Sequence, residues 1–147
     1  MPYRGALLTT RPMSPRPISD PAPLVAIVDD DDSWRSSTRM LVASFGFRAE
    51  AFARAKDFLT EPWLSETSCL ILDMVMPELN GLELQWELTR LRPSLPIIFI
   101  TAHAREPAVR QAMNAGAVAV LRKPVAETVL LNTLRASLGH GAVPAKS

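Results

Sequence analysis

Carboxylates, a hydroxyl and an amine follow four short apolar stretches of the chain. Together these groups could form a site for phosphoryl transfer. These side chains belong to Asp29 and Asp30, Asp73, Thr101 and Lys123. Carboxylates that are brought together raise one another's pKa unless a cation lies among them, and Mg²⁺ is a cation that prefers oxygen ligands. A carboxylate can then act as nucleophile and form an aspartyl phosphate. The ammonium and the hydroxyl can hold phosphoryl oxygens that the metal leaves uncovered.

The stretch that carries Asp73 is the one around which the rest of the chain is organised. The run Cys69–Leu72 is short and apolar, which is typical of a strand buried on both faces of a parallel sheet. Asp73 follows at once, and a helical pattern begins at Leu82 after the turn residues Asn80 and Gly81. Ligands of open α/β sheets bind at the carboxyl ends of the strands. We therefore expect Asp73 to perform the chemistry.

Five strands alternate with five helices along the chain. The strands are predicted at Leu24–Val28, Arg48–Phe52, Cys69–Leu72, Leu95–Ile100 and Val118–Leu121. This alternation predicts an α/β fold with a doubly wound, five-stranded parallel sheet covered by helices on both faces. In such a sheet the carboxyl ends of the strands converge on one edge, so the carboxylates, the hydroxyl and the amine that follow the strands should meet there.

The predicted helices end at turn residues and bury one stripe each. Ser33 is the predicted N-cap of the first helix, and Asp31 and Asp32 are expected to cap and charge-match it. Its inward face is predicted to hold Trp34, Thr38, Leu41 and Phe45, and Gly46 ends it. The other helices are predicted at Ala55–Thr60, from Leu82 to Pro93 with Leu84, Leu88 and Leu91 inward, from about Pro107 to Gly116, and from Ala126 to Leu138 with Leu131, Leu134 and Leu138 inward.

The 147 residues fit one domain with two tails. Residues 1–23 contain six prolines and are predicted to be a disordered tail, 24–138 form the domain, and 139–147 are a short polar tail. No apolar run is long enough to cross a membrane. The single cysteine, Cys69, excludes an intramolecular disulfide, is expected in the core, and fits a reducing, cytoplasmic compartment. Residues 24–138 hold 12 basic and 14 acidic residues, which argues against a nucleic-acid-binding face.

From about residue 24 to 138 the chain resembles the receiver domain of bacterial two-component response regulators, most closely those of the nitrogen-fixation type. The matching stretches are VAIVDDDD (25–32), LILDMVMPELNG (70–81), PIIFITAHA (96–104), NAGAVAVLRKP (114–124) and ETVLLNTL (127–134). The resemblance implies a flavodoxin-like receiver fold. It also implies that a sensor histidine kinase or a phosphotransfer protein phosphorylates the domain, which then switches a protein–protein interaction surface.

The resemblance assigns a role to each residue of the metal and phosphoryl site. Asp73 matches the phosphoacceptor. Asp30 matches a direct ligand of Mg²⁺ (or Mn²⁺), and Asp29 matches the neighbour that acts through water. The backbone carbonyl of Val75 matches the third protein ligand, beside Asp73 itself.

Thr101 and Lys123 match the switch hydroxyl and the phosphate-binding lysine, with a cis peptide expected before Pro124. The chain departs from the family at two positions where an aromatic residue is usual, since Val120 and Val125 stand there. We therefore expect an intact phosphorylation site with an altered readout. His103, two residues past Thr101, either lines the phosphoryl site or is a solvated loop residue.

Two other functions remain open from the residues alone. A phosphatase that passes through an aspartyl phosphate usually has a second aspartate two residues after the nucleophile, where this chain has Val75. We therefore predict that the protein is not an enzyme that acts on external substrates. The domain is expected to catalyse only its own phosphorylation and dephosphorylation. A structural pseudo-receiver would bind partners without phosphorylation, but the five polar site residues argue against it.

The predicted output is a contact with another protein. Only residues 139–147 follow the last helix, which is too short for a helix-turn-helix. We therefore expect a stand-alone receiver, although a truncated DNA-binding regulator stays open. The expected surface comprises the helix that ends at Gly116, the strand Val118–Leu121 and the last helix, with a possible homodimer through it. Neither nucleic acid nor membrane is an expected partner, and the exposed position predicted for Trp86 is a weaker candidate contact.

Overall fold

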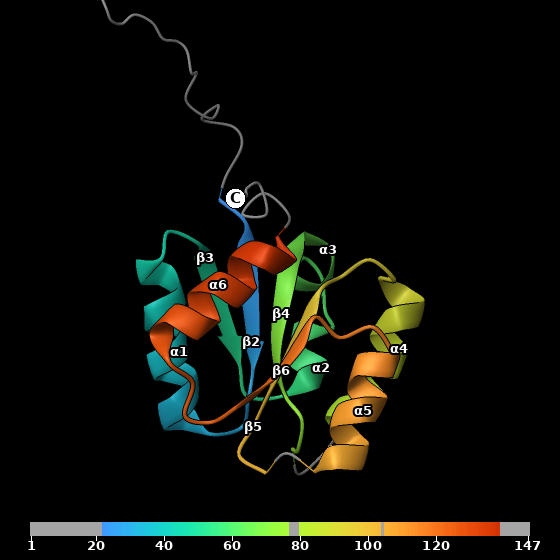
Figure 1. Ribbon diagram of the computed structural model, residues 1–147. Helices are drawn as coiled ribbons and strands as arrows, with labels where there is room; N and C mark the ends of the chain where they lie inside the picture. Colours follow the sequence, from blue (N-terminus) through green and yellow to red (C-terminus); the bar gives the residue numbers. More distant parts are fainter. Residues whose placement is uncertain (1–21, 77–79, 104, 139–147) are drawn as a thin grey trace, which may run out of the picture.

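The computed structural model describes residues 22–76, 80–103 and 105–138, and their strands form one parallel sheet (Figure 1). The strands are β2 (Leu24–Val28), β3 (Arg48–Phe52), β4 (Thr67–Asp73), β5 (Ile97–Thr101) and β6 (Ala119–Arg122). Their order across the sheet is β3-β2-β4-β5-β6, and all the pairings are parallel. The predicted α/β class and the parallel sheet are confirmed, and β3 lies at one edge of the sheet. The two predicted tails fall mostly outside the described residues and stay predictions.

Helices cover both faces of this sheet. They are α1 (Asp32–Ser44), α2 (Ala55–Phe58), α3 (Trp63–Glu66), α4 (Gly81–Leu91), α5 (Glu106–Asn114) and α6 (Glu127–Ser137). Helices α1 and α6 pack on one face, and α2, α4 and α5 pack on the other (Figure 1). None of the helices in the described ranges is long and apolar enough to cross a membrane.

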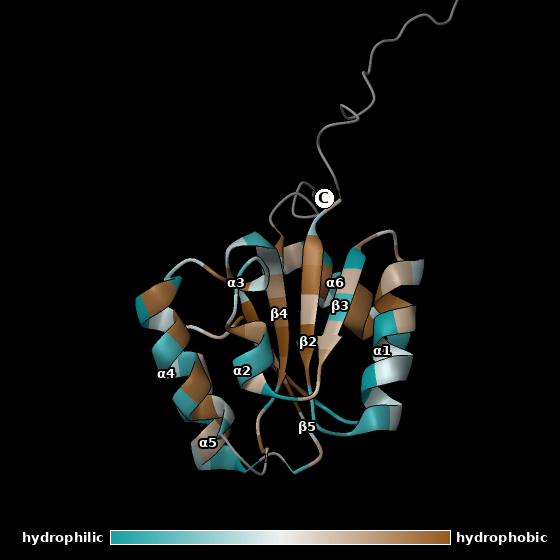
Figure 2. Cartoon of the chain, turned by 180° about the vertical axis from the view of Figure 1, so that it is seen from behind, coloured by the Kyte–Doolittle hydropathy of each residue, from teal (hydrophilic) through white to brown (hydrophobic). Residues whose placement is uncertain are grey.

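The central strands carry apolar side chains at consecutive positions because their two faces pack against two separate cores. In β4, Cys69 and Ile71 pack toward α1 and α6, whereas Leu70 and Leu72 pack toward α2, α4 and α5. All four side chains are buried. Figure 2 shows the result as brown strands between helices whose outer surfaces carry teal, hydrophilic residues. A strand without polar alternation is thus buried on both faces, as the sequence predicts.

Two predicted helix faces need correction. Leu91, predicted to point inward, is 50% exposed, while Gln85 is only 2% exposed and takes a place in the interior of α4. In α6, Leu130 is buried with Leu134, whereas Leu131 is only partly buried. Leu84, Leu88 and Leu134 are buried as the sequence predicts, so only single positions differ. The 3.6-residue period places two adjacent positions close to the inward direction, and the period alone does not decide between them.

Element ends also differ from the prediction. The predicted N-cap Ser33 is wrong, because Asp31 caps α1 by accepting a hydrogen bond from the N–H of Trp34 at 3.1 Å. The role expected for Asp31 is therefore correct. The short helix α3 follows directly after Pro62, beyond the predicted helix Ala55–Thr60 and in a stretch where the sequence predicts no helix. The sequence pattern does not reveal α3 because its four residues are too few for a periodicity.

Candidate functional site

Three carboxylates meet at the carboxyl edge of the sheet. Asp29 and Asp30 follow β2, and Asp73 is the last residue of β4. The two strands are neighbours in the sheet, with Val28 opposite Leu72, so their ends lie side by side. One carboxylate oxygen from each of the three aspartates lies within 4.8 Å of the others. Asp29 and Asp73 are buried, whereas Asp30 is exposed at the rim.

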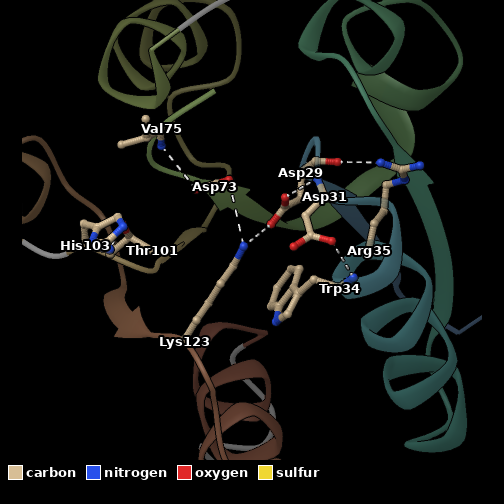
Figure 3. Close-up of polar contacts among 9 residues, drawn as sticks. All are labelled: Asp29, Asp31, Trp34, Arg35, Asp73, Val75, Thr101, His103 and Lys123. Atoms are coloured by element: carbon tan, nitrogen blue, oxygen red, sulfur yellow. Dashed lines mark hydrogen bonds and ion pairs between the residues drawn. The ribbon is translucent and has the colours of Figure 1, made fainter. Parts of the chain in front are cut away.

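The ammonium group of Lys123 reaches into this cluster from the end of β6 (Figure 3). Its Nζ lies 2.8 Å from Oδ2 of Asp29, with which it forms a hydrogen-bonded ion pair, and 3.9 Å from Oδ2 of Asp73. The backbone N–H of Lys123 donates to the carbonyl oxygen of Thr101 at 2.9 Å. The Lys123-Pro124 peptide is cis, as the resemblance implies.

Thr101 ends β5 and is buried one strand away from Asp73. Its hydroxyl oxygen accepts a hydrogen bond from the backbone N–H of His103 at 3.1 Å. That contact leaves the hydroxyl proton of Thr101 available to another acceptor. The side chain of His103 is exposed, which favours the solvated-loop interpretation of this residue.

Val75 lies two residues beyond Asp73, and its side chain is 65% exposed. Its backbone N–H donates to Oδ1 of Asp73 at 3.2 Å, so the backbone of this loop turns toward the carboxylate (Figure 3). The role of the Val75 carbonyl as a metal ligand stays a prediction.

Burial raises the pKa of Asp73 from 3.8 to about 6. The backbone N–H of Val75 and the ammonium of Lys123 favour the carboxylate, whereas the negative charges of Asp29 and Asp30 add to the rise in pKa. The Asp73 carboxylate is therefore held in an environment that disfavours its charge. A cation among the three aspartates would relieve this, and an all-oxygen donor set of carboxylates fits a hard divalent cation.

A second layer of contacts holds Asp29 in place. Its Oδ1 accepts a hydrogen bond from the N–H of Asp31 at 2.8 Å, and its backbone carbonyl accepts one from Nη1 of Arg35 at 2.8 Å (Figure 3). Arg35 cannot be singled out from the sequence, because an arginine in the first turns of a helix is ordinarily a solvated residue. Trp34, expected to pack inward, is partly buried against the core and also lies beneath the ammonium of Lys123.

The sequence of residues 25–135 matches the family model of the response regulator receiver domain. The chain belongs to this family. Receiver domains work in two-component phosphorelays, where they interact with histidine kinases or phosphotransfer proteins. The acidic cluster and the parallel sheet of this receiver domain agree with the expectation from the sequence resemblance.

Named relatives support the subgroup. The receiver domain is 42% identical over 123 residues to the response regulator protein TodT of Pseudomonas putida, covering 84% of this chain and 54% of TodT. It is 34% identical over 118 residues to the transcriptional regulatory protein FixJ of Azorhizobium caulinodans, covering 80% of this chain and 56% of FixJ. The chain thus spans about half the length of the curated relatives it matches.

The solved structure of the response regulator StyR is also similar. It superposes on this receiver domain with a TM-score of 0.73 at 43% identity, covering 83% of this chain and 62% of the StyR chain. The likeness supports the fold and the family together. The length comparison leaves any further domain of a longer protein, and the stand-alone architecture expected from the sequence, as untested predictions.

Proposed function

We propose that this receiver domain accepts a phosphoryl group on Asp73 from a sensor histidine kinase or a phosphotransfer protein. The observation that carries the proposal is the arrangement of three carboxylates within 4.8 Å of one another, with the Lys123 ammonium between Asp29 and Asp73. Oxygen donors that converge on one point suit a divalent cation, and a fixed ammonium suits the phosphoryl oxygens.

Asp73 is the best nucleophile among the three aspartates. Asp29 is fully buried and its carboxylate is already bonded to Lys123 and to the N–H of Asp31. Asp30 is exposed, so water competes for its charge. Asp73 keeps an oxygen that lies 3.9 Å from Lys123, beyond hydrogen-bond distance, and therefore has a lone pair to spare. In the reaction this oxygen forms a bond to phosphorus while the bond between phosphorus and the donor's histidine nitrogen breaks.

Asp29, Asp30, Asp73 and the backbone carbonyl of Val75 would hold Mg²⁺ or Mn²⁺. The bound ion would neutralise part of the negative charge on the carboxylates and on the transferred phosphoryl group. Lys123 would move from Asp29 toward a phosphoryl oxygen, and the Thr101 hydroxyl would donate its proton to another. The domain would catalyse only its own phosphorylation and dephosphorylation, because the position of a second acid-base aspartate is Val75.

The output surface proposed for this domain comprises α5, β6 and α6. Two apolar side chains, Met113 on α5 and Val129 on α6, are exposed there and suit a protein partner or a second copy of the chain. Val120 on β6 packs against the core instead of presenting an aromatic ring, so we expect a small conformational shift. The slightly acidic domain supports a protein partner in the cytoplasm over nucleic acid or a membrane.

The test of the phosphorylation site is labelling with radioactive acetyl phosphate in the presence and absence of Mg²⁺. Wild type should be labelled only with the metal, and Asp73→Asn should not be labelled. Asp30→Ala should need a much higher Mg²⁺ concentration. Asp57→Asn, at an exposed aspartate of α2, is the matched control and should behave as wild type. Label retained on Asp73→Asn would show that the acceptor is another residue.

The test of the output surface is sedimentation and amide hydrogen exchange with and without a beryllofluoride mimic of the phosphoryl group. The mimic should alter exchange in residues 105–135 and promote modest homodimerisation, and Met113→Glu should prevent the association. If neither association nor exchange changes while Asp73 is occupied, the proposed surface is wrong. Tight DNA binding by this chain at physiological salt would contradict the choice of a protein partner.

A further inference from the structure

The ammonium group of Lys123 lies against the face of an aromatic ring. Its Nζ is 4.5 Å from the centroid of the Trp34 ring, well within the distance at which a cation is attracted to an aromatic face. The Lys123 side chain is only 16% exposed, so little water competes for its charge. Tryptophan is also the aromatic side chain that binds cations best.

The ring is itself fixed with respect to the carboxylates. Trp34 is in the first turn of α1, and its backbone N–H is held by the capping carboxylate of Asp31. The next residue, Arg35, donates a hydrogen bond to the backbone carbonyl of Asp29. Two contacts thus tie this turn of the helix to the end of β2, and Figure 3 shows the indole between α1 and the Lys123 ammonium.

The three neighbours of the Lys123 ammonium leave one of its N–H groups free to bind a group attached to Asp73. Asp29 accepts its hydrogen bond at 2.8 Å, the Trp34 ring takes another side, and Asp73 lies at 3.9 Å. An ammonium has three N–H donors, so one donor remains for a group attached to Asp73. Without the ring, the flexible four-carbon side chain would lose a contact that confines it to this place.

We propose that Trp34 is a positioning residue for phosphoryl transfer: its ring holds the Lys123 ammonium beside Asp73, ready to bind a phosphoryl oxygen. The functional consequence rests on the proposed phosphorylation of Asp73, whereas the contact between ring and ammonium does not. The competing explanation is that the indole only fills space beside the core, where Leu41 and Phe45 also pack. The two explanations differ in whether an aromatic face is required.

The first experiment reads the contact directly and needs no phosphorylation. In the NMR spectrum of the metal-free domain, ring currents should shift the Lys123 side-chain methylene protons upfield. Trp34→Leu should abolish that shift, and Trp34→Phe should keep part of it. Trp86→Leu is the matched control, because the Trp86 ring also contacts a cation, that of Arg90 at 5.3 Å, but on the exposed side of α4. Ordinary lysine shifts in wild type, or shifts unchanged by Trp34→Leu, would overturn the proposal.

The second experiment measures the rate of labelling by acetyl phosphate at saturating Mg²⁺, with thermal unfolding followed in parallel. Trp34→Leu should slow labelling about three- to tenfold, the range that a cation–π contact of ordinary strength provides. Trp34→Phe should restore much of the rate, and Trp86→Leu should match wild type. Equal rates for wild type and Trp34→Leu would overturn the proposal, as would a Trp34→Phe variant that is folded but as slow as Trp34→Leu.

The outcomes separate this inference from the proposed function. If wild type is not labelled, or if Asp73→Asn is labelled, the proposed phosphoacceptor is wrong, and the NMR experiment still decides whether Trp34 holds Lys123. If wild type is labelled on Asp73 and Trp34 has no effect on either readout, only the role of Trp34 is wrong.

Discussion

Gly81, the first residue of α4, lies directly against the backbone of Asp73. A Cβ atom on Gly81 would be 2.7 Å from the carbonyl oxygen of Asp73, closer than carbon and oxygen atoms approach without a bond. The N–H of Gly81 also donates to the carbonyl oxygen of Met74 at 2.9 Å. The absence of a side chain therefore lets α4 begin at the end of β4, where the proposed phosphoacceptor is.

Gly81→Ala should destabilise the domain by about 1–3 kcal/mol despite the better helix propensity of alanine, because the added methyl group must push backbone aside. It should also slow labelling of Asp73, since the displaced backbone carries that residue. Urea unfolding and acetyl phosphate labelling measure the two effects. Glu83→Asp, which keeps the negative charge at an exposed position in the same turn, should change neither. If Gly81→Ala has the stability and the labelling rate of wild type, the start of α4 can move away from the end of β4 without loss of stability.

Asp73 should make the metal-free domain less stable at neutral pH. Its folded pKa of about 6 lies above the ordinary value of 3.8, so the folded state binds this proton more tightly than the unfolded state. Asp73 therefore does not lower the free energy of unfolding below about pH 4. The free energy of unfolding falls as the pH rises toward 6, and the full destabilisation is present above pH 6. Asp73→Asn should therefore be more stable than wild type at pH 7.5 by about 1–2 kcal/mol, less than the full shift gives because water screens the site.

Urea unfolding of the two proteins between pH 4 and 8, without divalent cations, measures this difference, which should vanish toward pH 4. Adding Mg²⁺ at pH 7.5 should stabilise wild type and leave Asp73→Asn nearly unchanged. Asp57→Asn is again the control for loss of an ordinary exposed carboxylate. A wild type that is the more stable protein at pH 7.5 without metal would contradict the assigned pKa direction.

Val75→Asn should accelerate loss of the phosphoryl group from Asp73. Hydrolysis needs a water in line with phosphorus, and the exposed valine has no polar group with which to position one. An asparagine amide could do so, and one such hydrogen bond corresponds to about a two- to tenfold change in rate. Decay of the labelled protein after removal of acetyl phosphate gives the rate, with Val129→Asn as an exposed control. Fast loss in wild type that does not respond to residue 75 would refute the explanation.

Gln85→Leu should loosen α5 from α4. The Gln85 side chain is buried, and its Nε2 donates to the carbonyl oxygen of Ala112 at 3.0 Å. That carbonyl keeps a hydrogen bond from the N–H of Ala117, so the loss of stability should be moderate, about 0.5–1.5 kcal/mol. Amide exchange in residues 106–114 should rise together with the urea sensitivity. Gln111→Leu, at an exposed glutamine of α5, should show neither effect, and equal exchange in the two variants would count against this link between the helices.

The sheet and the residues at its edge can be predicted from local patterns in the chain. Uniformly apolar runs such as Cys69–Leu72 indicate strands buried on both faces, and their alternation with helical patterns predicts a parallel sheet with helices on each side. Since the carboxyl ends of parallel strands meet at one edge, Asp29, Asp73 and Lys123 are predicted on the same edge of the sheet. Gly46 and Gly116 mark helix ends by their positive φ angles, which are local properties and can be predicted locally.

Contacts between elements that are distant in the chain could not be predicted, because they depend on how those elements pack. Gln85 is buried in place of Leu91 because α5 offers it a carbonyl partner, and hydropathy along α4 contains no information about that partner. Trp34 and Lys123 are 89 residues apart in the sequence, and their contact depends on where α1 and the end of β6 lie across the sheet. Local patterns determine which residues are strand ends and helix faces, whereas the partner of each side chain is set by elements distant in the chain.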